Sequence, residues 1–165
     1  MRAGRPGAGA QAPQGLHQYL TLSLGGEAYA IDILRVQEIR SYETPTRIVN
    51  APDFVRGVIN LRGEIVPIMD MRLKLHLPPQ EYTALTVVVV LRAGGLLVGI
   101  VVDSVSDVVS LSPESIRPAP QFESSMDSRF VTGLARMEDR MLIVVDMDAL
   151  LSRSELGLVE GALSA

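Results

Sequence analysis

Hydrophobic and polar residues alternate along much of the chain, in short runs bounded by turn-forming residues. The clearest run is Gly57–Met71, where apolar positions on either side of Arg62-Gly63 predict two strands joined by a tight turn, with one face buried. The stretches Gln18–Leu24 and Glu27–Ile33 alternate in the same way around Gly25-Gly26, which predicts a hairpin. The pattern therefore indicates a mainly β protein.

Later segments extend this reading. Residues Ala84–Leu91 are rich in valine and lack alternation, which predicts a strand buried on both faces. Leu96–Val102 and Val105–Leu111 read as further strands, and Phe130–Val145 reads as two more. Ile33–Ile39 fits either a helical turn or a strand, and we favour a short turn leading into a strand.

Helical structure is expected only in short pieces. Pro52–Arg56 is predicted to form one helical turn, and Asp70 is a good N-cap for another. The capping box Ser152–Glu155 predicts a marginal C-terminal helix over residues 152–165. Residues 1–15 are Gly, Ala, Pro, Gln and Arg without periodicity, so we expect a disordered tail ahead of a folded domain at 16–151.

The pattern repeats inside the chain. Phe54–Met71 matches Phe130–Met147 without a gap, and Ala30–Ile39 matches Gly99–Val108 in register. Each half then has the same order of hairpin, strand, helical turn and paired strands, and is the size of a small five-stranded barrel. The alternative is that β-rich segments resemble each other through composition alone. We expect two five-stranded barrels built from a duplicated unit.

Composition narrows the function classes. The net charge of −4 gives no sign of the basic face that nucleic-acid binding requires. The chain has no cysteine, which removes disulfides and thiolate chemistry and favours a reducing, intracellular setting. No apolar stretch is long enough to span a membrane, and residues Met1–Gly15 lack the apolar core of a signal peptide.

No catalytic, metal or cofactor site is predicted. His17 and His76 have no suitably spaced ligand partner, and no nucleophile elbow, P-loop or dinucleotide fingerprint occurs. Asp70 and Asp146 are interpreted as helix caps rather than catalytic acids. The sequence leaves open a carboxylate pair for acid–base work, although nothing argues for one.

Two charged residues lie within apolar strands, Glu38 and Arg62. Long charged side chains beside buried strands usually reach out to solvent. The sharper hypothesis is a partly buried Glu38–Arg62 ion pair that holds two strands of the first barrel in register. The matching residues of the second half, Asp107 and Glu138, are both acidic, so we expect this pair in the first half only.

Four apolar residues, Ile33, Val36, Val105 and Val108, come from matching positions of the two halves. If the barrels pack side by side, these residues line the seam between them and form a docking groove. The alternative is that they belong to an ordinary core.

The residues just described also carry a family resemblance, which runs from about Gln18 to Leu151. The chain resembles the bacterial chemotaxis coupling (adaptor) proteins of the CheW family. Its specific parts are YAIDILRVQEIR (Tyr29–Arg40), FVRGVINLRGEIVPIMDMR (Phe54–Arg72), VGIVVDSVSDVVSL (Val98–Leu111), IRPAP (Ile116–Pro120) and DRMLIVVDMDALL (Asp139–Leu151). The resemblance implies two Src-homology-3-like barrels packed side by side, no enzymatic activity and no cofactor.

The resemblance also implies partners. The family bridges the cytoplasmic tips of methyl-accepting chemoreceptors and the regulatory domain of the histidine kinase CheA, without nucleic acid and without direct membrane insertion. We therefore expect a cytoplasmic protein held at the inner face of the membrane through receptor arrays. Carried over by position, the receptor-binding groove would contain Ile33, Val36, Gly57, Val105 and Val108. The coupling charge pair would be Glu38 and Arg62, and the kinase-binding residues would be Arg117 and Phe122.

Three other functions stay open. The first is a coupling role for the same fold in another chemosensory array, such as one for surface motility. A small β-barrel enzyme or ligand binder would instead have an enclosed pocket with convergent polar groups. A detached kinase regulatory domain is disfavoured, because no phosphotransfer or ATP-binding segment precedes the fold.

Overall fold

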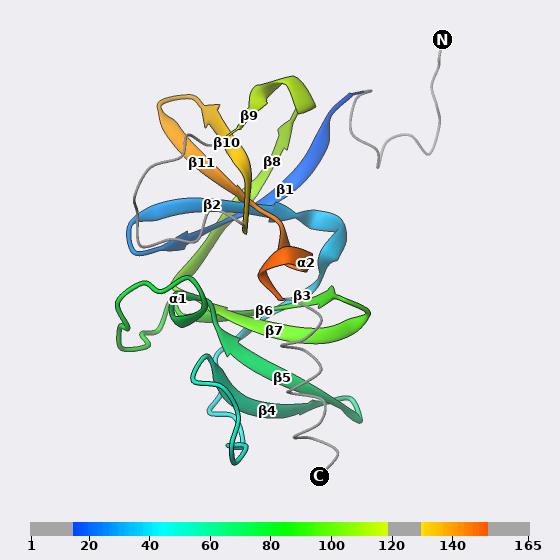
Figure 1. Cartoon of the computed structure of the whole chain (residues 1–165), viewed down its shortest axis with the longest axis vertical. Coiled ribbons are helices and arrows are strands. Elements are labelled where there is room, and N and C mark those ends of the chain that lie inside the picture. The colour runs from blue at the N-terminus through cyan, green and yellow to red at the C-terminus, as the bar shows by residue number, and fades with distance from the viewer. Residues whose placement is uncertain (1–14, 119–129, 152–165) are drawn as a thin grey trace.

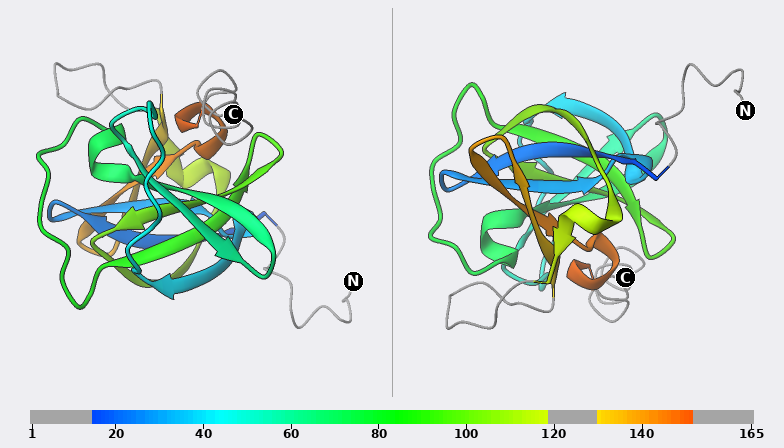
Figure 2. Two further views of the ribbon diagram at one scale, coloured as in Figure 1. Left: turned by 90° about the horizontal axis from the view of Figure 1, so that it is seen from below. Right: turned by 90° about the horizontal axis from the view of Figure 1, so that it is seen from above.

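The structure is a computed structural model, and it describes residues 15–118 and 130–151. These residues form two β-sheets that lie one above the other (Figure 1) and overlap when seen end-on (Figure 2). The six-stranded sheet has the order β8-β1-β2-β11-β10-β9, with β1 (His17–Leu24), β2 (Glu27–Asp32), β8 (Ser104–Leu111), β9 (Ile116–Arg117), β10 (Val131–Met137) and β11 (Arg140–Val145). The five-stranded sheet has the order β3-β6-β7-β5-β4, with β3 (Val36–Ser41), β4 (Val55–Leu61), β5 (Glu64–Asp70), β6 (Val87–Ala93) and β7 (Leu96–Val102).

The two sheets share one topology, which confirms the prediction of two related, barrel-like β subdomains. In each sheet a hairpin, β1–β2 or β6–β7, pairs in parallel with a later strand, β11 or β5. That later strand then pairs in antiparallel fashion with β10 or β4. A sheet-closing segment follows: β9 beside β10 in one subdomain, and Thr46 beside Val58 of β4 in the other.

The hairpins, however, are exchanged between the two halves of the chain. The first hairpin, β1–β2, joins β8–β11, whereas the hairpin β6–β7 joins β3–β5. We expected each half of the chain to build its own barrel in chain order, and the structure shows that this prediction is wrong. One subdomain is therefore continuous from Val36 to Val102, and it is inserted between β2 and β8 of the other.

The exchange gives the hairpin strands two buried faces, as predicted for Ala84–Leu91. On β6, Val88 and Val90 face the core of their own subdomain, while Val89 and Leu91 belong to a larger cluster shared by both sheets. The shared cluster takes residues from β1, β2, β5, β6, β7 and β11 together with α1 (Met71–Lys74) and α2 (Met147–Leu150). The seam between the subdomains is thus the largest piece of the described core.

Both short helices begin as the sequence predicts. Asp70 and Asp146 are the N-caps of α1 and α2, and their carboxylates accept hydrogen bonds from Leu73 and Ala149 at 3.2 and 3.1 Å. The helical turn predicted for Pro52–Arg56 is instead a reverse turn closed by the bond from the Val55 N–H to the Pro52 carbonyl. Strand β4 starts at Val55 and leaves no room for a helical turn.

A glycine at the same place in each subdomain lets the sheet close. Strands β4 and β10 shift register at Gly57 and Gly133. A Cβ on Gly57 would lie 2.2 Å from the Thr46 carbonyl oxygen, and one on Gly133 would lie 2.5 Å from the Arg117 carbonyl oxygen. These approaches are far below van der Waals contact, so both positions require glycine.

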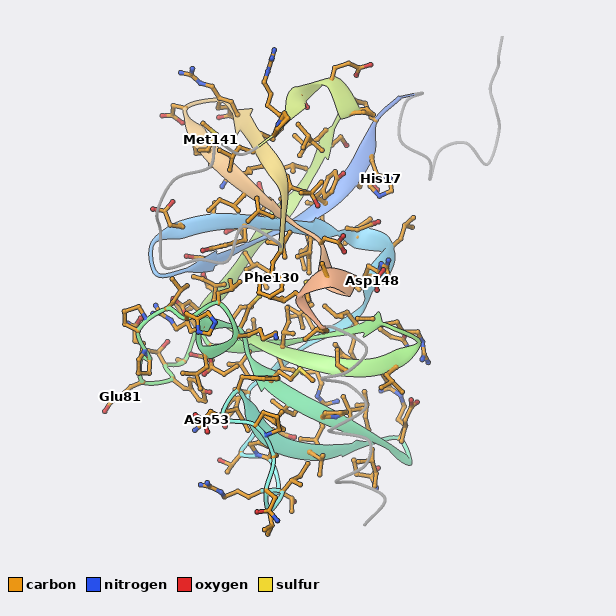
Figure 3. The ribbon with its side chains drawn as sticks, viewed as in Figure 1. His17, Asp53, Glu81, Phe130, Met141 and Asp148 are labelled. Atoms are coloured by element: carbon orange, nitrogen blue, oxygen red, sulfur yellow. The ribbon has the colours of Figure 1, made fainter. Side chains whose placement is uncertain are left out.

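One face of the seam is sealed by a buried lysine between two equivalent phenylalanines. The Lys74 ammonium lies 4.7 Å from the ring centre of Phe54 and 5.3 Å from that of Phe130. Phe54 and Phe130 precede β4 and β10, and their carbonyls accept equivalent hydrogen bonds from Asp70 and Asp146. Figure 3 shows Phe130 at the level of the seam. Each desolvated cation–π contact contributes on the order of 1–2 kcal/mol.

A buried ionic clamp holds one end of the seam. Arg72 on α1 donates from Nε and Nη2 to Asp103, at 2.9 and 2.6 Å, and from Nη1 to the Pro78 carbonyl at 2.8 Å. Asp103, at the crossover from β7 to β8, also accepts the N–H of Gly25 in the β1–β2 turn at 2.9 Å. This clamp, which we call the Arg72 clamp, ties a helix, a crossover and a hairpin turn from both subdomains.

The other end of the seam carries the same arrangement with the charges reversed. Here Asp148, which matches Arg72 in the repeat, lies on α2 (Figure 3) and accepts two hydrogen bonds from Arg35, one of them at 2.9 Å. Asp148 also accepts the N–H of Gly94 in the β6–β7 turn at 3.2 Å. Arg35 lies in the 3₁₀ turn η2 (Ile33–Arg35), which is the crossover from β2 to β3. We call this group the Arg35 clamp.

The glycine at the β4 register shift leads to the first prediction. Gly57→Ala should lower the free energy of unfolding by about 1–3 kcal/mol more than Gly63→Ala, because the new Cβ meets backbone rather than space. Both glycines have positive φ, 143° and 87°, and nothing lies within 4 Å of a Cβ built on Gly63. Urea unfolding of both variants measures the difference, and equal losses would contradict the close approach.

The Arg72 clamp leads to a prediction about acid stability. Hydrogen bonds from Arg72 lower the pKa of the Asp103 carboxyl below its ordinary value of 3.8, against the opposing effect of burial. Because the folded state holds this proton less tightly than the unfolded state, the stabilisation is complete above the ordinary pKa. It is lost as the pH falls through the lowered value.

Asp103→Asn should therefore flatten the decline of unfolding free energy between about pH 5 and pH 3. Urea unfolding at several pH values measures this slope. Asp139→Asn, an exposed carboxylate in the β10–β11 turn, is the control for the loss of one acidic group. A slope in Asp103→Asn as steep as that of the parent protein would contradict the clamp.

Candidate docking groove between the two subdomains

The open face of the seam is bordered by two outer strands, β3 and β8, each the first in its sheet order. In Figure 1, β8 passes behind β2 and β3 passes behind β6, whereas β10 passes in front of β2. The side with β3 and β8 is therefore opposite the side on which β10 lies.

A β-bulge turns two apolar residues of β3 toward the seam. Val36 pairs with Leu91 and Ile39 pairs with Val89, with the register shifted between Val36 and Glu38. Leu91 and Val89 both belong to the shared cluster, so Val36 and Ile39 lie on the same seam-facing side of the sheet. Ile39 is 45% exposed, because β3 has no further strand beside it.

Strand β8 repeats this device in the other sheet. Val105 pairs with Leu22 and Val108 pairs with Leu20, with a register shift between the two pairs. Leu22 and Leu20 are part of the shared cluster, so Val105 and Val108 also face the seam. Val108 is 47% exposed and occupies the position that Ile39 occupies in β3.

Together these side chains form an apolar band whose inner members pack on the shared core and whose outer members face solvent. We call it the seam band, and its residues are Ile33, Val36, Ile39, Val105 and Val108. Of the four residues predicted at the seam, Ile33, Val36 and Val105 are half-buried against the shared core, while Val108 is exposed. Their role in a docking groove stays a prediction. Leu34, in η2 beside the band, is also exposed.

Sequence reasoning missed Ile39 for a specific reason. A regular strand has a period of two, which places residues three apart on opposite faces. The bulge restores them to one face, and a bulge has no reliable mark in a single sequence. The internal repeat was the available signal, since it pairs Ile39 with Val108.

Gly57 is placed differently from the other predicted groove residues. It is buried in the β4 bulge against the Thr46 carbonyl and adds no side chain to the seam band. Any effect of Gly57 on docking would therefore act through the path of β4, and its assignment to the groove stays a prediction.

Glu38 and Arg62 are brought together in the first subdomain. Arg62, in the tight turn between β4 and β5, donates to the Glu38 carboxylate on β3, and Arg40 donates to the same carboxylate at 3.3 Å. Hydrogen bonding from Arg62 lowers the pKa of Glu38. The contact joins β3, at one edge of the sheet order, to the turn that follows β4, at the other edge. Arg62 is 69% exposed, so the pair lies at the surface. Its role in coupling stays a prediction.

The expectation of a charge pair in one half only is wrong. Asp107 of β8 contacts Arg140, the first residue of β11, at 3.4 Å. The matching turn residue Glu138 is indeed acidic, but an arginine two positions later reaches the carboxylate instead. The Thr21 hydroxyl also donates to Asp107 and lowers its pKa further than Arg140 does.

The predicted kinase-binding residues are only partly described. Arg117 is exposed on the short outer strand β9, where its carbonyl faces Gly133. Phe122, residues 1–14 of the tail predicted at 1–15, and the helix predicted at 152–165 lie outside the described residues.

The described residues also bear on catalysis and metal binding. No group of three or more metal-ligating side chains gathers within residues 15–118 and 130–151. A cavity of about 390 Å³ beside β4 is lined by Arg47, Ile48, Ala51, Pro52, Asp53, Val55, Arg56 and Leu73. It contains no histidine or hydroxyl nucleophile to pair with its single carboxylate. In the same described ranges, no helix is long and apolar enough to cross a bilayer.

Comparison with known proteins gives a consistent picture. The sequence profile of the CheW-like domain matches residues 18–155. The chain is 53% identical over 143 residues to a chemotaxis protein CheW from Klebsiella aerogenes, covering 87% of this chain and 86% of that one. It is 30% identical over 134 residues to a CheW from Bacillus subtilis, covering 81% and 86%.

A solved structure agrees with the fold. The crystal structure of the scaffolding protein TtCheW from Thermoanaerobacter tengcongensis superposes with a TM-score of 0.77 at 29% identity, covering 84% of this chain and 94% of that one. Because the family profile spans most of the chain and the relatives match it over nearly their whole length, this protein belongs to the CheW family of chemotaxis scaffold proteins.

Proposed function

We propose that this protein is a non-catalytic cytoplasmic adaptor that couples the cytoplasmic tips of chemoreceptors to the regulatory domain of the histidine kinase CheA. The observation that carries the proposal is the seam band. It places exposed apolar side chains from two different subdomains on one face, between two outer strands.

The shape of this surface favours a helical partner. An amphipathic helix docks by laying an apolar stripe into an apolar groove, with contacts spaced three to four residues apart. Val36 and Ile39 on one border and Val105 and Val108 on the other provide such a lining from both sides. A receptor tip is a helical hairpin, so one of its helices fits between β3 and β8.

One further surface would serve the kinase. Arg117 is exposed on β9, in the subdomain formed by β1, β2 and β8–β11, and we place the kinase contact there. The family resemblance adds Phe122, which lies outside the described residues. The adaptor then acts geometrically, since a single chain contacts the receptor at the seam and the kinase at its end. Signalling requires that the receptor state changes the free energy of one of these contacts.

A coupling protein of another chemosensory array would use the same groove. The two functions differ only in the partner proteins. A pull-down from lysate of the source cell, with the purified chain as bait, distinguishes them. Recovery of chemoreceptors and CheA supports the proposal, whereas recovery of only a motility-array kinase favours the alternative.

The seam band gives a direct test. Val108→Glu should raise the Kd for a receptor-tip helical hairpin about tenfold or more, because a carboxylate is placed against an apolar helix face. The fold should tolerate the change, since Val108 is half-exposed. Leu85→Glu is the matched control, because Leu85 is exposed and lies outside the band. Isothermal titration calorimetry measures the Kd of both variants, and equal affinities would contradict docking at the seam.

The Glu38–Arg62 contact gives a second test. Glu38→Ala and Arg62→Ala should each lower receptor-dependent kinase activity in a reconstituted assembly, and the double variant should lose less than the sum of the two. The reversed pair, Glu38→Arg with Arg62→Glu, should recover part of the loss. Arg140→Ala, which removes the equivalent contact to Asp107, shows whether the effect is particular to the first subdomain. Strictly additive losses would show that the pair has no role in coupling.

A further inference from the structure

We propose that the Arg35 clamp is a positioning device that sets the width of the groove between β3 and β8, and that the subdomains open and close there about the Arg72 clamp. The effect on receptor binding rests on the proposed function, whereas the effect on groove width does not.

The Arg35 clamp acts directly on the groove wall. Arg35 is the last residue of η2, directly between exposed Leu34 and the seam-band residue Val36. Its guanidinium is held by Asp148 on α2, which follows β11 of the other subdomain. The same carboxylate accepts the Gly94 N–H from the β6–β7 turn. Loss of Asp148 therefore removes the side-chain contact that ties η2, just before β3, to α2.

The two clamps differ in burial, although they occupy equivalent corners. The Arg72 side chain is 9% exposed, its partner Asp103 is 32% exposed, and Arg72 also bonds to Pro78 and Gln80. The Arg35 and Asp148 side chains are 38% and 46% exposed, and the clamp they form is screened by water and salt. The Arg72 corner is thus the fixed end, and the Arg35 corner is the end that yields first.

The remaining contacts leave this motion available. Lys74 between Phe54 and Phe130 seals the side of the seam where β10 lies, close to α1 and the Arg72 corner. On the groove side, the half-buried seam-band residues lie between outer strands that belong to different sheets. Rotation about the sealed side changes the distance between β3 and β8 without breaking either sheet.

The two clamps show that either charge can stand on the helix and the opposite charge on the crossover. The Arg72 corner has arginine on the helix and aspartate on the crossover, and the Arg35 corner has the reverse. In both, the aspartate accepts the hairpin-turn N–H. Reversing the charges at the Arg35 corner therefore gives the charge order of the Arg72 corner, with the aspartate one position later in the repeat, since Asp103 matches Leu34.

The distance between β3 and β8 is measured on the full-length chain by double electron–electron resonance spectroscopy between two spin labels. The chain has no cysteine, so labels at Gln37→Cys and Ser106→Cys, exposed residues at equivalent positions of β3 and β8, are specific. Asp148→Asn should shift or broaden the distance distribution, and the parent protein in high salt should move the same way. The reversed pair, Arg35→Asp with Asp148→Arg, should bring the distribution part of the way back to that of the parent protein, because the ion pair returns while the acceptor of the Gly94 N–H does not. Asp139→Asn should leave the distribution unchanged.

Binding of a receptor-tip hairpin provides the second readout. Asp148→Asn should raise the Kd about two- to fivefold, the scale of one exposed ion pair, and the reversed pair should bring it part of the way back. An unchanged distance distribution in Asp148→Asn, or no recovery in the reversed pair, overturns the inference. A shifted distribution with no hairpin binding even by the parent protein supports the positioning role and refutes the proposed function.

Discussion

The structure depends on one packing constraint: strands of the two hairpins must be buried on both faces. Val88 and Val90 fill one subdomain while Val89 and Leu91, on the same strand, fill the seam. A strand of this kind is stable only when a second sheet covers its outer face. Each subdomain therefore needs the other to bury its hairpin. Because one subdomain is inserted into the other, two chain connections also link them covalently.

Much of this architecture follows from the sequence. The alternation in Gly57–Met71, the caps at Asp70 and Asp146, and the internal repeat are all local signals, and the structure confirms them. Which sheet a hairpin joins is not a local property, because each hairpin pairs with a strand far from it in the chain or in the other half of the repeat: β2 with β11, and β7 with β5. For this reason the repeat predicted two β units but not the exchange between them.

The site shows the same division. Apolar residues at matching positions marked the seam, but two bulges decide that Ile39 and Val108 face it. The second charge pair escaped prediction because Arg140 stands two residues from the position that the repeat aligns with Arg62. Equivalent backbones thus carry unlike side chains, which gives the two ends of one shared seam different charges.

The insertion of Val36–Val102 between β2 and β8 has a consequence for biosynthesis. The β1–β2 hairpin leaves the ribosome first, but its neighbours β8 and β11 are made last. At usual elongation rates that delay is on the order of ten seconds. The inserted subdomain holds all five of its strands by residue 102 and is the natural first unit to fold. The nascent hairpin meanwhile exposes an apolar face, for which the finished inserted subdomain offers a cotranslational template.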